Sequence, residues 1–372
     1  MDRLVIRKNR TKKRNYASSS KRVFVIKSEK KDDNNNNARI LTTRKKNTML
    51  YFILVFVSFL YITSRLYKYF FPSPNIDPTG KYVLITGCSS GFGYALAVEL
   101  DKRGFNVFAG VRNLQKASSL QEQLSSRSRV FTLDITKQDD IDAAYTMIKK
   151  QTNTLHALVN NAGMSKNGYI DWMTMDLMRQ HMDVNFFGHV AMTKTFLPLL
   201  IAKRDSRVVN VSSISGFISF GTGAAYSSAK YALESFSDCL RREMGPWGLR
   251  VSIIEPGAMK TSFFSEQEIS WNKLWNESSS DVRQRWGDEF SNNLLRVMVD
   301  NPMVKYAENP LITVRDIEHA VMNINPRIRY RSGWQAKLMF ILHTLPAWLV
   351  DQIVLSGIAN LIPAGMCDQP TD

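Results

Sequence analysis

Cysteine and histidine are scarce in this sequence, and their spacing is uninformative. The 372 residues include three cysteines, Cys88, Cys239 and Cys367, which are far apart and form no CxxC pair. This argues against a disulfide framework. The five histidines show no metal-ligand spacing, so no metal site is predicted.

The formal net charge is also small outside the first 48 residues. Residues 1–48 hold 16 Lys/Arg and 4 Asp/Glu, whereas residues 49–372 hold 33 and 29. The formal charge of +16 therefore resides mainly in the N-terminal segment. A nucleic-acid binder needs a basic stripe on a structured element, so no nucleic-acid partner is predicted. Contact with anionic lipid headgroups explains the same charge.

The N-terminal segment has two predicted parts. Residues 1–46 are rich in charge and asparagine and bury too little apolar area to fold, which predicts a disordered arm. Residues 47–66 form a predicted transmembrane anchor, because "NTMLYFILVFVSFLYITS" (47–64) contains no charge. As a helix this run would span roughly 27 Å, close to the thickness of an ER bilayer. A cleavable signal peptide is disfavoured, because no small-residue cleavage site follows.

The charges beside the anchor predict its orientation. Three basic residues (44–46) precede the uncharged run 47–64 and two, Arg65 and Lys68, follow it. By the positive-inside rule this favours a cytosolic N-terminus and a lumenal catalytic domain, in a single-pass ER membrane protein. The sequon at Asn276, in a predicted loop, would then be open to glycosylation. A second sequon, at Asn210, falls in a predicted buried strand and should stay unmodified.

After a proline-rich linker (67–79), residues 80–300 alternate short β-branched runs with helical patterns. This predicts a single α/β catalytic domain with a doubly wound, Rossmann-type parallel sheet. Residues 301–372 are predicted to form an apolar helical extension, which is broken by His343, Pro346 and Asp351. This pattern favours a membrane-associated or substrate-covering segment. The predicted strands are "YVLIT", "NVFAGV", "RVFTLDI", "ALVNNAG", "RVVNVSS" and "RVSIIEPG".

Several motifs point to a dinucleotide site. Gly87, Gly91 and Gly93 lie between the first strand and the first helix, where a backbone without Cβ atoms can approach a pyrophosphate. Asp134 ends one strand, where a carboxylate could accept from an adenine amino group. "NNAG" (160–163) ends the next strand, again at the carboxyl edge where open α/β sheets bind ligands.

Four motifs in order carry a resemblance to the short-chain dehydrogenase/reductase family over about 220 residues. They are the glycine turn at 86–93, "NNAG" at 160–163, "NVSS" at 210–213 and "YSSAK" at 226–230, followed by "EPG" at 255–257. The resemblance implies that Tyr226 is the general acid/base, that Lys230 lowers its pKa, that Ser213 binds the reacting oxygen and that Asn185 completes a tetrad. A free phenol titrates near ~10, and an ammonium one turn away favours the phenolate.

The resemblance also implies a cofactor site. Val111 stands where many NAD users carry an aspartate, and Arg112 can pair with a 2′-phosphate, which favours NADP(H) over NAD(H). Lys230 would also hold the nicotinamide ribose, and Thr261 the carboxamide. The implied cofactor residues are Thr86, Gly87, Ser89, Ser90, Gly91, Phe92, Gly93, Arg112, Asp134, Asn161, Ala162, Gly163, Tyr226, Lys230, Pro256, Gly257 and Thr261.

A narrower resemblance covers "ESFSDCLRREM", "NPRIRYRSGWQAKLMF" and "LPAWLVDQIV". These segments look like the branch of retinol dehydrogenases and hydroxysteroid dehydrogenases that includes 17β-hydroxysteroid dehydrogenase type 6. The implied substrate is a retinoid or hydroxysteroid, and family members commonly form homodimers. The long basic arm and Arg112 depart from the branch. Two alternatives stay open: a mitochondrial 3-hydroxybutyrate-type dehydrogenase, and a non-catalytic dinucleotide-binding scaffold.

Overall fold

The computed structural model describes residues 29–71, 73–115, 118–261, 267–358 and 360–366. The chain divides into two units, Met1–Pro72 and Ser73–Asp372. The second unit contains a seven-stranded parallel sheet with helices on both faces. The predicted fold class is therefore confirmed, together with an apolar N-terminal helix and a helical C-terminal segment.

Helix α1 (Glu29–Phe70) contains the predicted anchor and is 42 residues long. Its segment Arg44–Ser64 has a mean hydropathy of 1.7, and none of it is buried within the structure. The helix begins earlier than the sequence predicts, because residues 29–46 belong to the predicted disordered arm. A helix that has nucleated gains one hydrogen bond for each residue added, which lets it extend into a polar sequence. The predicted arm at 1–28 lies outside the described residues.

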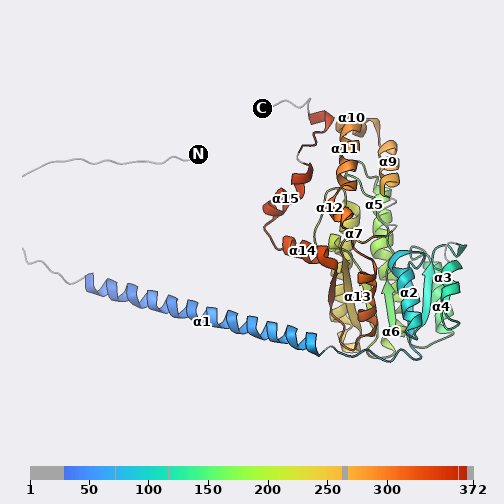
Figure 1. Ribbon diagram of the computed structural model, residues 1–372, viewed down its shortest axis with the longest axis horizontal. Helices are drawn as coiled ribbons and strands as arrows, with labels where there is room; N and C mark the ends of the chain where they lie inside the picture. Colours follow the sequence, from blue (N-terminus) through green and yellow to red (C-terminus); the bar gives the residue numbers. More distant parts are fainter. Residues whose placement is uncertain (1–28, 72, 116–117, 262–266, 359, 367–372) are drawn as a thin grey trace, which may run out of the picture. The chain divides into compact units, whose positions relative to one another are not determined.

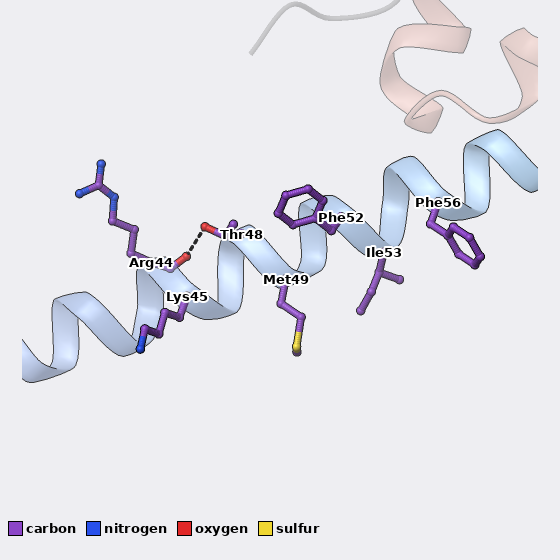
Figure 2. A pocket seen from close by; sticks show the side chains of 7 residues that line it. All are labelled: Arg44, Lys45, Thr48, Met49, Phe52, Ile53 and Phe56. Carbon is purple, nitrogen blue, oxygen red and sulfur yellow. Dashed lines mark hydrogen bonds between the residues drawn. The ribbon is translucent and has the colours of Figure 1, made fainter.

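The basic and apolar parts of α1 adjoin each other (Figure 2). Thr48 Oγ1 donates a hydrogen bond to the Arg44 carbonyl oxygen at 2.8 Å, one turn before the aromatic side chains begin. Basic side chains next to an apolar run are typical of a helix that enters a bilayer. A shallow groove on this stretch carries none of the predicted catalytic or cofactor residues; it is lined by Arg44, Lys45, Thr48, Met49, Phe52, Ile53 and Phe56.

A second apolar stretch, Met175–Ile201, is also long enough to span a membrane, but 44% of it is buried. It comprises α5 (Met175–Met182), a π-helical turn (Asp183–Phe187) and α6 (Gly188–Ile201) of the second unit, and the apolar face of α6 packs against the sheet. It is therefore a core element of the α/β unit.

The strand order β3-β2-β1-β4-β5-β6-β7 reverses direction between β1 and β4. Ligands of open α/β sheets bind at the carboxyl ends of strands beside such a switch point. The glycine turn follows β1 and "NNAG" follows β4, so the fold brings these two motifs to the switch point. The strands are β1 (Tyr82–Thr86), β2 (Asn106–Val111), β3 (Arg129–Thr132), β4 (Ala157–Asn160), β5 (Arg207–Val211), β6 (Arg250–Pro256) and β7 (Arg329–Ser332).

Alternate residues of each strand face opposite sides of the sheet and produce two cores. One core packs α2, α3 and α13 against one face, and the other packs α4, α6 and α7 against the opposite face. The described helices of this unit are α2 (Gly91–Lys102), α3 (Ser118–Gln123), α4 (Gln138–Lys149), α5 (Met175–Met182), α6 (Gly188–Ile201), α7 (Ala224–Glu243), α9 (Gln267–Glu277), α10 (Ser280–Trp286), α11 (Asp288–Val299), α12 (Pro302–Lys305), α13 (Leu311–Met322), α14 (Gly333–His343) and α15 (Ala347–Leu355).

The boundary expected at residue 300 does not separate two structures. Strand β7 pairs in parallel with β6, from Ile253 opposite Arg329 to Pro256 opposite Ser332. The segment 301–372 therefore supplies the last strand of the sheet as well as helices. Sequence reading missed this strand because "RYRS" alternates charged and uncharged residues, as an edge strand does.

The linker is also more ordered than its proline content suggests. Asn323 Nδ2 donates to the Ser73 carbonyl oxygen at 2.7 Å. The Ile76 amide donates to the Met322 carbonyl oxygen at 2.8 Å, and the Ile324 amide to that of Pro74 at 3.1 Å. These bonds fix the start of the second unit to the end of α13. The earlier part of the predicted linker, 67–70, is the last turn of α1.

Helices α9, α10 and α11 gather at one end of the unit (Figure 1). Trp172 is buried among their aromatic side chains, with its ring centroid 5.1 Å from that of Trp271 and 4.7 Å from that of Trp275. The segment that follows "NNAG" is thereby anchored beneath these helices. Asn276 is exposed as expected, but it lies in the last turn of α9 rather than in a loop.

Candidate active site

The glycine turn between β1 and α2 is suited to a pyrophosphate. Gly87 and Gly91 have φ angles of +73° and +62°, a left-handed backbone that favours glycine. A Cβ atom on Gly93 would lie 2.5 Å from both the Gly87 carbonyl oxygen and Asn161 Nδ2. In contrast, no described atom lies within 4 Å of the Cβ position of Gly91. The turn is thus tightly packed inside and open at the N-terminus of α2, where amide groups bind phosphate.

Thr86 and Asn161 connect the ends of β1 and β4. Thr86 Oγ1 accepts hydrogen bonds from the amides of Asn161 and Ala162, each at 3.0 Å. Asn161 Nδ2 donates to the carbonyl oxygens of Thr86 at 2.9 Å and Gly87 at 3.1 Å. Both predicted cofactor residues therefore use their side chains to hold the turn, and any contact to a dinucleotide would come through the backbone they shape.

Four more predicted residues lie in the turn, in the first turn of α2 or after β4. Ser89 and Ser90 precede α2, and Ser90 has an extended backbone with φ −164°. Phe92, in the first turn of α2, is half-buried and packs against the core on that face of the sheet. Its side chain therefore serves packing. Gly163 follows "NNA", and a Cβ atom there would lie 3.2 Å from Asn185 Oδ1.

The predicted adenosine side is formed at the ends of β2 and β3. Arg112 directly follows β2 and is exposed. Asp134 Oδ1 accepts from the Thr136 amide at 3.0 Å and from the Thr136 hydroxyl at 2.7 Å. Partial burial opposes ionisation, but these hydrogen bonds and the nearby Arg112 charge hold the pKa of Asp134 below its ordinary value. The two predicted residues thus share one electrostatic environment.

Helix α7 and the end of β5 bring together Ser213, Tyr226 and Lys230. The last two lie one turn apart near the start of α7. Lys230 Nζ donates to the Val211 carbonyl oxygen at 2.8 Å and lies 5.7 Å from the centroid of the Tyr226 ring. Ser213 Oγ accepts from the Ser215 amide at 3.1 Å, and its side chain is hydrogen-bonded to Tyr226. The two hydroxyls that the sequence predicts to bind a reacting oxygen are therefore brought together.

Burial controls the ionisation of this group. It raises the pKa of Tyr226 to about 12, although the Ser213 hydroxyl opposes the rise. It lowers the pKa of Lys230 to about 7, against the opposing charge of Glu234. This differs from the expectation that Lys230 would lower the Tyr226 pKa. Both charged forms lose hydration at the same buried place, so in the protein alone burial outweighs their mutual attraction.

Asn185 is buried in a π-helical turn, Asp183–Phe187, between α5 and α6. Its Oδ1 accepts from the Met164 amide and its Nδ2 donates to the Met164 carbonyl oxygen, both at 3.0 Å. A π turn inserts one extra residue and often marks a functional position. Here it directs the amide toward the segment after "NNAG", which it holds by two hydrogen bonds.

The last predicted residues lie in the loop after β6. Pro256 ends the strand, and the Gly257 amide donates to the Ser332 carbonyl oxygen of β7 at 3.1 Å. Thr261 is half-buried, and its hydroxyl makes a long contact of 3.5 Å to the Met259 carbonyl oxygen. The described part of this loop ends at Thr261.

Sequence reasoning missed a residue that holds this loop. Gln335, fully buried in α14, accepts from the Ala258 amide at 3.1 Å. Its Nε2 donates to the carbonyl oxygens of Met303 at 2.9 Å and Tyr306 at 3.1 Å. The available signal was an uncharged polar residue within the apolar run "GWQAKLMF". A buried amide of this kind needs hydrogen-bond partners.

Comparisons with known proteins agree with this geometry. The family model described as short chain dehydrogenase matches residues 81–270. The chain is 39% identical over 280 residues to 17-beta-hydroxysteroid dehydrogenase type 6 of Bos taurus, covering 74% of this chain and 87% of that protein. It is 40% identical over 280 residues to retinol dehydrogenase 16 of Rattus norvegicus, covering 73% and 87%.

Two further comparisons extend the match. The chain is 36% identical over 330 residues to 3beta-hydroxysteroid dehydrogenase dhs-16 of Caenorhabditis elegans, covering 84% of each protein. The crystal structure of a short-chain dehydrogenase from Streptomyces avermitilis superposes with a TM-score of 0.60 at 25% identity, covering 76% of this chain and 98% of that one. The resemblance to this family is confirmed.

Proposed function

The chain belongs to the short-chain dehydrogenase family, and from this premise we propose that it interconverts a retinoid or hydroxysteroid alcohol and its carbonyl at a membrane. It is an NAD(P)-dependent oxidoreductase that acts on CH–OH groups. The observation that carries the proposal is the assembly of Ser213, Tyr226 and Lys230 at the carboxyl end of β5. The names of the relatives supply the substrate class.

Each catalytic residue has a proposed task. Tyr226 takes the hydroxyl proton of the alcohol during oxidation and returns it to the carbonyl oxygen during reduction. Ser213 donates a hydrogen bond to the same oxygen and orients it. Lys230 holds the nicotinamide ribose and favours the phenolate. Asn185 keeps the segment at Met164 in place. The bound nicotinamide supplies the hydride acceptor or donor.

We assign the phosphate-binding role to the turn at 86–93 and the backbone at 161–163. The open space around the Cβ position of Gly91, at the start of α2, supports this. The loop Pro256–Thr261 takes the nicotinamide side. For the adenosine side we propose NADP(H), because Arg112 is exposed directly after β2 and can pair with a 2′-phosphate. Asp134 then contacts the adenine.

We also propose that α1 attaches the protein to the ER membrane, and the flanking charges support a lumenal catalytic unit. The C-terminal segment supports the choice of a lipophilic substrate. Helix α15 has no buried residue, and Trp348 is 63% exposed there. Trp334 and Ile341 of α14 are exposed as well. Aromatic and aliphatic side chains presented this way suit the lipid interface. Exposed Phe187 and Tyr231, near α6 and on α7, support a homodimer.

The test is cofactor turnover by membranes that carry the full chain, with Tyr226→Phe as the control. All-trans-retinol, androstanediol and 3-hydroxybutyrate are each offered with NAD and NADP. We expect turnover of a lipophilic alcohol that falls by ~10²-fold or more in the variant, since it loses its acid/base group. Turnover of 3-hydroxybutyrate alone would assign the mitochondrial alternative. Cofactor binding without any turnover would favour the non-catalytic scaffold.

A further inference from the structure

Thr222 has a strained backbone just before the catalytic helix α7. Its φ angle is +70°, in the left-handed region that a β-branched residue adopts only at a cost in stability. Of the described residues other than glycine, only Asp205 also has a positive φ, and aspartate tolerates this conformation. Glycine, which would be relaxed here, stands on both sides of Thr222. The turn therefore carries a threonine at the one position where a glycine would suit the backbone better.

Backbone hydrogen bonds hold the strained turn in place. The Gly168 amide, in the segment after "NNAG", donates to the Thr222 carbonyl oxygen at 2.9 Å. The Gly223 amide donates to the carbonyl oxygen of Phe220 at 3.3 Å, and the Ser227 amide, in the first turn of α7, donates to that of Gly223 at 2.7 Å. All three bonds use main-chain atoms. Glycine or alanine at position 222 could form them equally well, so they do not account for the threonine side chain.

The strained turn lies next to the catalytic group. It ends the loop that runs from Ser213 to the start of α7, and Tyr226 follows Thr222 by four residues. Ala225, directly before Tyr226, packs into the aromatic cluster of α9–α11. Thr222 itself is half-buried, and none of the hydrogen bonds among the described residues involves its hydroxyl. Its side chain therefore remains available to a molecule that binds at Tyr226.

We propose that Thr222 is a specificity-determining residue, whose side chain contacts the lipophilic alcohol beside the reacting oxygen. The inference rests on the proposed function, because it requires an alcohol that is held by Ser213 and Tyr226. Strained residues persist where the surrounding structure fixes them, and they concentrate at functional sites. Contact with the substrate explains a side chain that costs stability and makes none of the hydrogen bonds of its own turn.

The test compares Thr222→Gly with Thr222→Ala in the full-length protein in membranes. Glycine removes both the side chain and the strain, whereas alanine removes the hydroxyl and a methyl group but keeps an L-residue in the left-handed backbone. In both variants kcat/KM should fall by about tenfold for the better substrate of all-trans-retinol and androstanediol. The affinity for NADPH and NADH, followed by nicotinamide fluorescence without substrate, should stay unchanged.

Thermal unfolding, followed by tryptophan fluorescence, is the second measurement. The melting temperature of Thr222→Gly should not fall, because relief of the strain offsets the entropy that glycine adds to the unfolded chain. Thr146→Gly is the matched control, since Thr146 is exposed within α4, where the backbone is helical. This control should melt at a lower temperature, because glycine is a poorer helix former, and should keep its kcat/KM.

A lower kcat/KM in both variants at position 222, with no loss of stability in Thr222→Gly, supports the proposal. An unchanged kcat/KM overturns it. A fall confined to Thr222→Gly also overturns it, because the cause would then be the flexibility of three consecutive glycines. A fall accompanied by a lower melting temperature or a weaker NAD(P)H affinity assigns Thr222 a structural role instead. If the unsubstituted protein oxidises neither alcohol, the proposed function fails and this inference fails with it.

Discussion

The replacement of Gln335 by leucine tests whether the C-terminal segment is part of the cofactor site. Gln335 is fully buried and bonds three backbone groups from two segments: the Ala258 amide and the carbonyl oxygens of Met303 and Tyr306. Leucine has a similar volume but neither donors nor acceptors. The change therefore removes the polar interactions while it leaves the packing largely intact.

The expected cost follows from the groups left without partners. Each buried donor or acceptor that loses its hydrogen bond costs about 1–3 kcal/mol, and three such groups give roughly 3–6 kcal/mol if neighbouring atoms compensate in part. In a domain of this size 1 kcal/mol lowers the melting temperature by about 2–4 °C. We therefore expect Gln335→Leu to melt about 10 °C lower. The affinity for NAD(P)H should fall as well, since the loop at Gly257 is released.

The assay is thermal unfolding of the full chain by tryptophan fluorescence, together with NAD(P)H titration below the melting range. Gln352→Leu is the control, because Gln352 is exposed on α15 and the change in chemistry is identical. Equal melting temperatures and equal NAD(P)H affinities for the two variants would refute the reasoning. The segment after residue 300 would then not contribute to the cofactor site.

Two further predictions concern the cofactor and the topology. Arg112→Asp should shift the ratio of kcat/KM for NADP over NAD by about tenfold or more toward NAD, because it replaces a charge-assisted hydrogen bond to a 2′-phosphate with repulsion. Steady-state kinetics with both cofactors measure this ratio. An unchanged ratio would show that Arg112 is not part of the cofactor site. Membranes from a glycosylating host should show an endoglycosidase-sensitive form of the protein that disappears in Asn276→Gln. This result would establish that Asn276 is exposed to the lumen. A glycan that persists in this variant would contradict the assignment of the glycosylation site to Asn276.

Most of the sheet could be predicted from the sequence because buried parallel strands are nearly continuous apolar runs. Each of the six predicted runs contains an observed strand, although the last four strands end before the predicted run does, the third of the six at Thr132. The seventh strand could not be found in this way. Its arginines at 329 and 331 are held by Glu255 of β6, so its place in the sheet depends on partners far away in the chain.

The same distinction holds in the candidate site. The glycine turn and the Tyr226–Lys230 pair are local features, whose spacing along one turn or one helix already defines their geometry. Gln335 and Glu234 contact residues that are distant in sequence: Gln335 reaches Ala258 across 77 positions, and Glu234 reaches Arg329 on another element. Local patterns carry no information about such contacts, so these two residues became visible only in the folded chain.

The ionisation of the site shows why spacing alone was insufficient. The i,i+4 spacing of Tyr226 and Lys230 suggests a phenol activated by an adjacent ammonium, but it does not indicate that Lys230 is only 3% exposed. Burial moves both pKa values toward the neutral forms, to about 12 for Tyr226 and about 7 for Lys230. A neutral lysine cannot favour a phenolate. The charge of Glu234, one turn further along α7, opposes the loss of the Lys230 proton but does not offset the effect of burial.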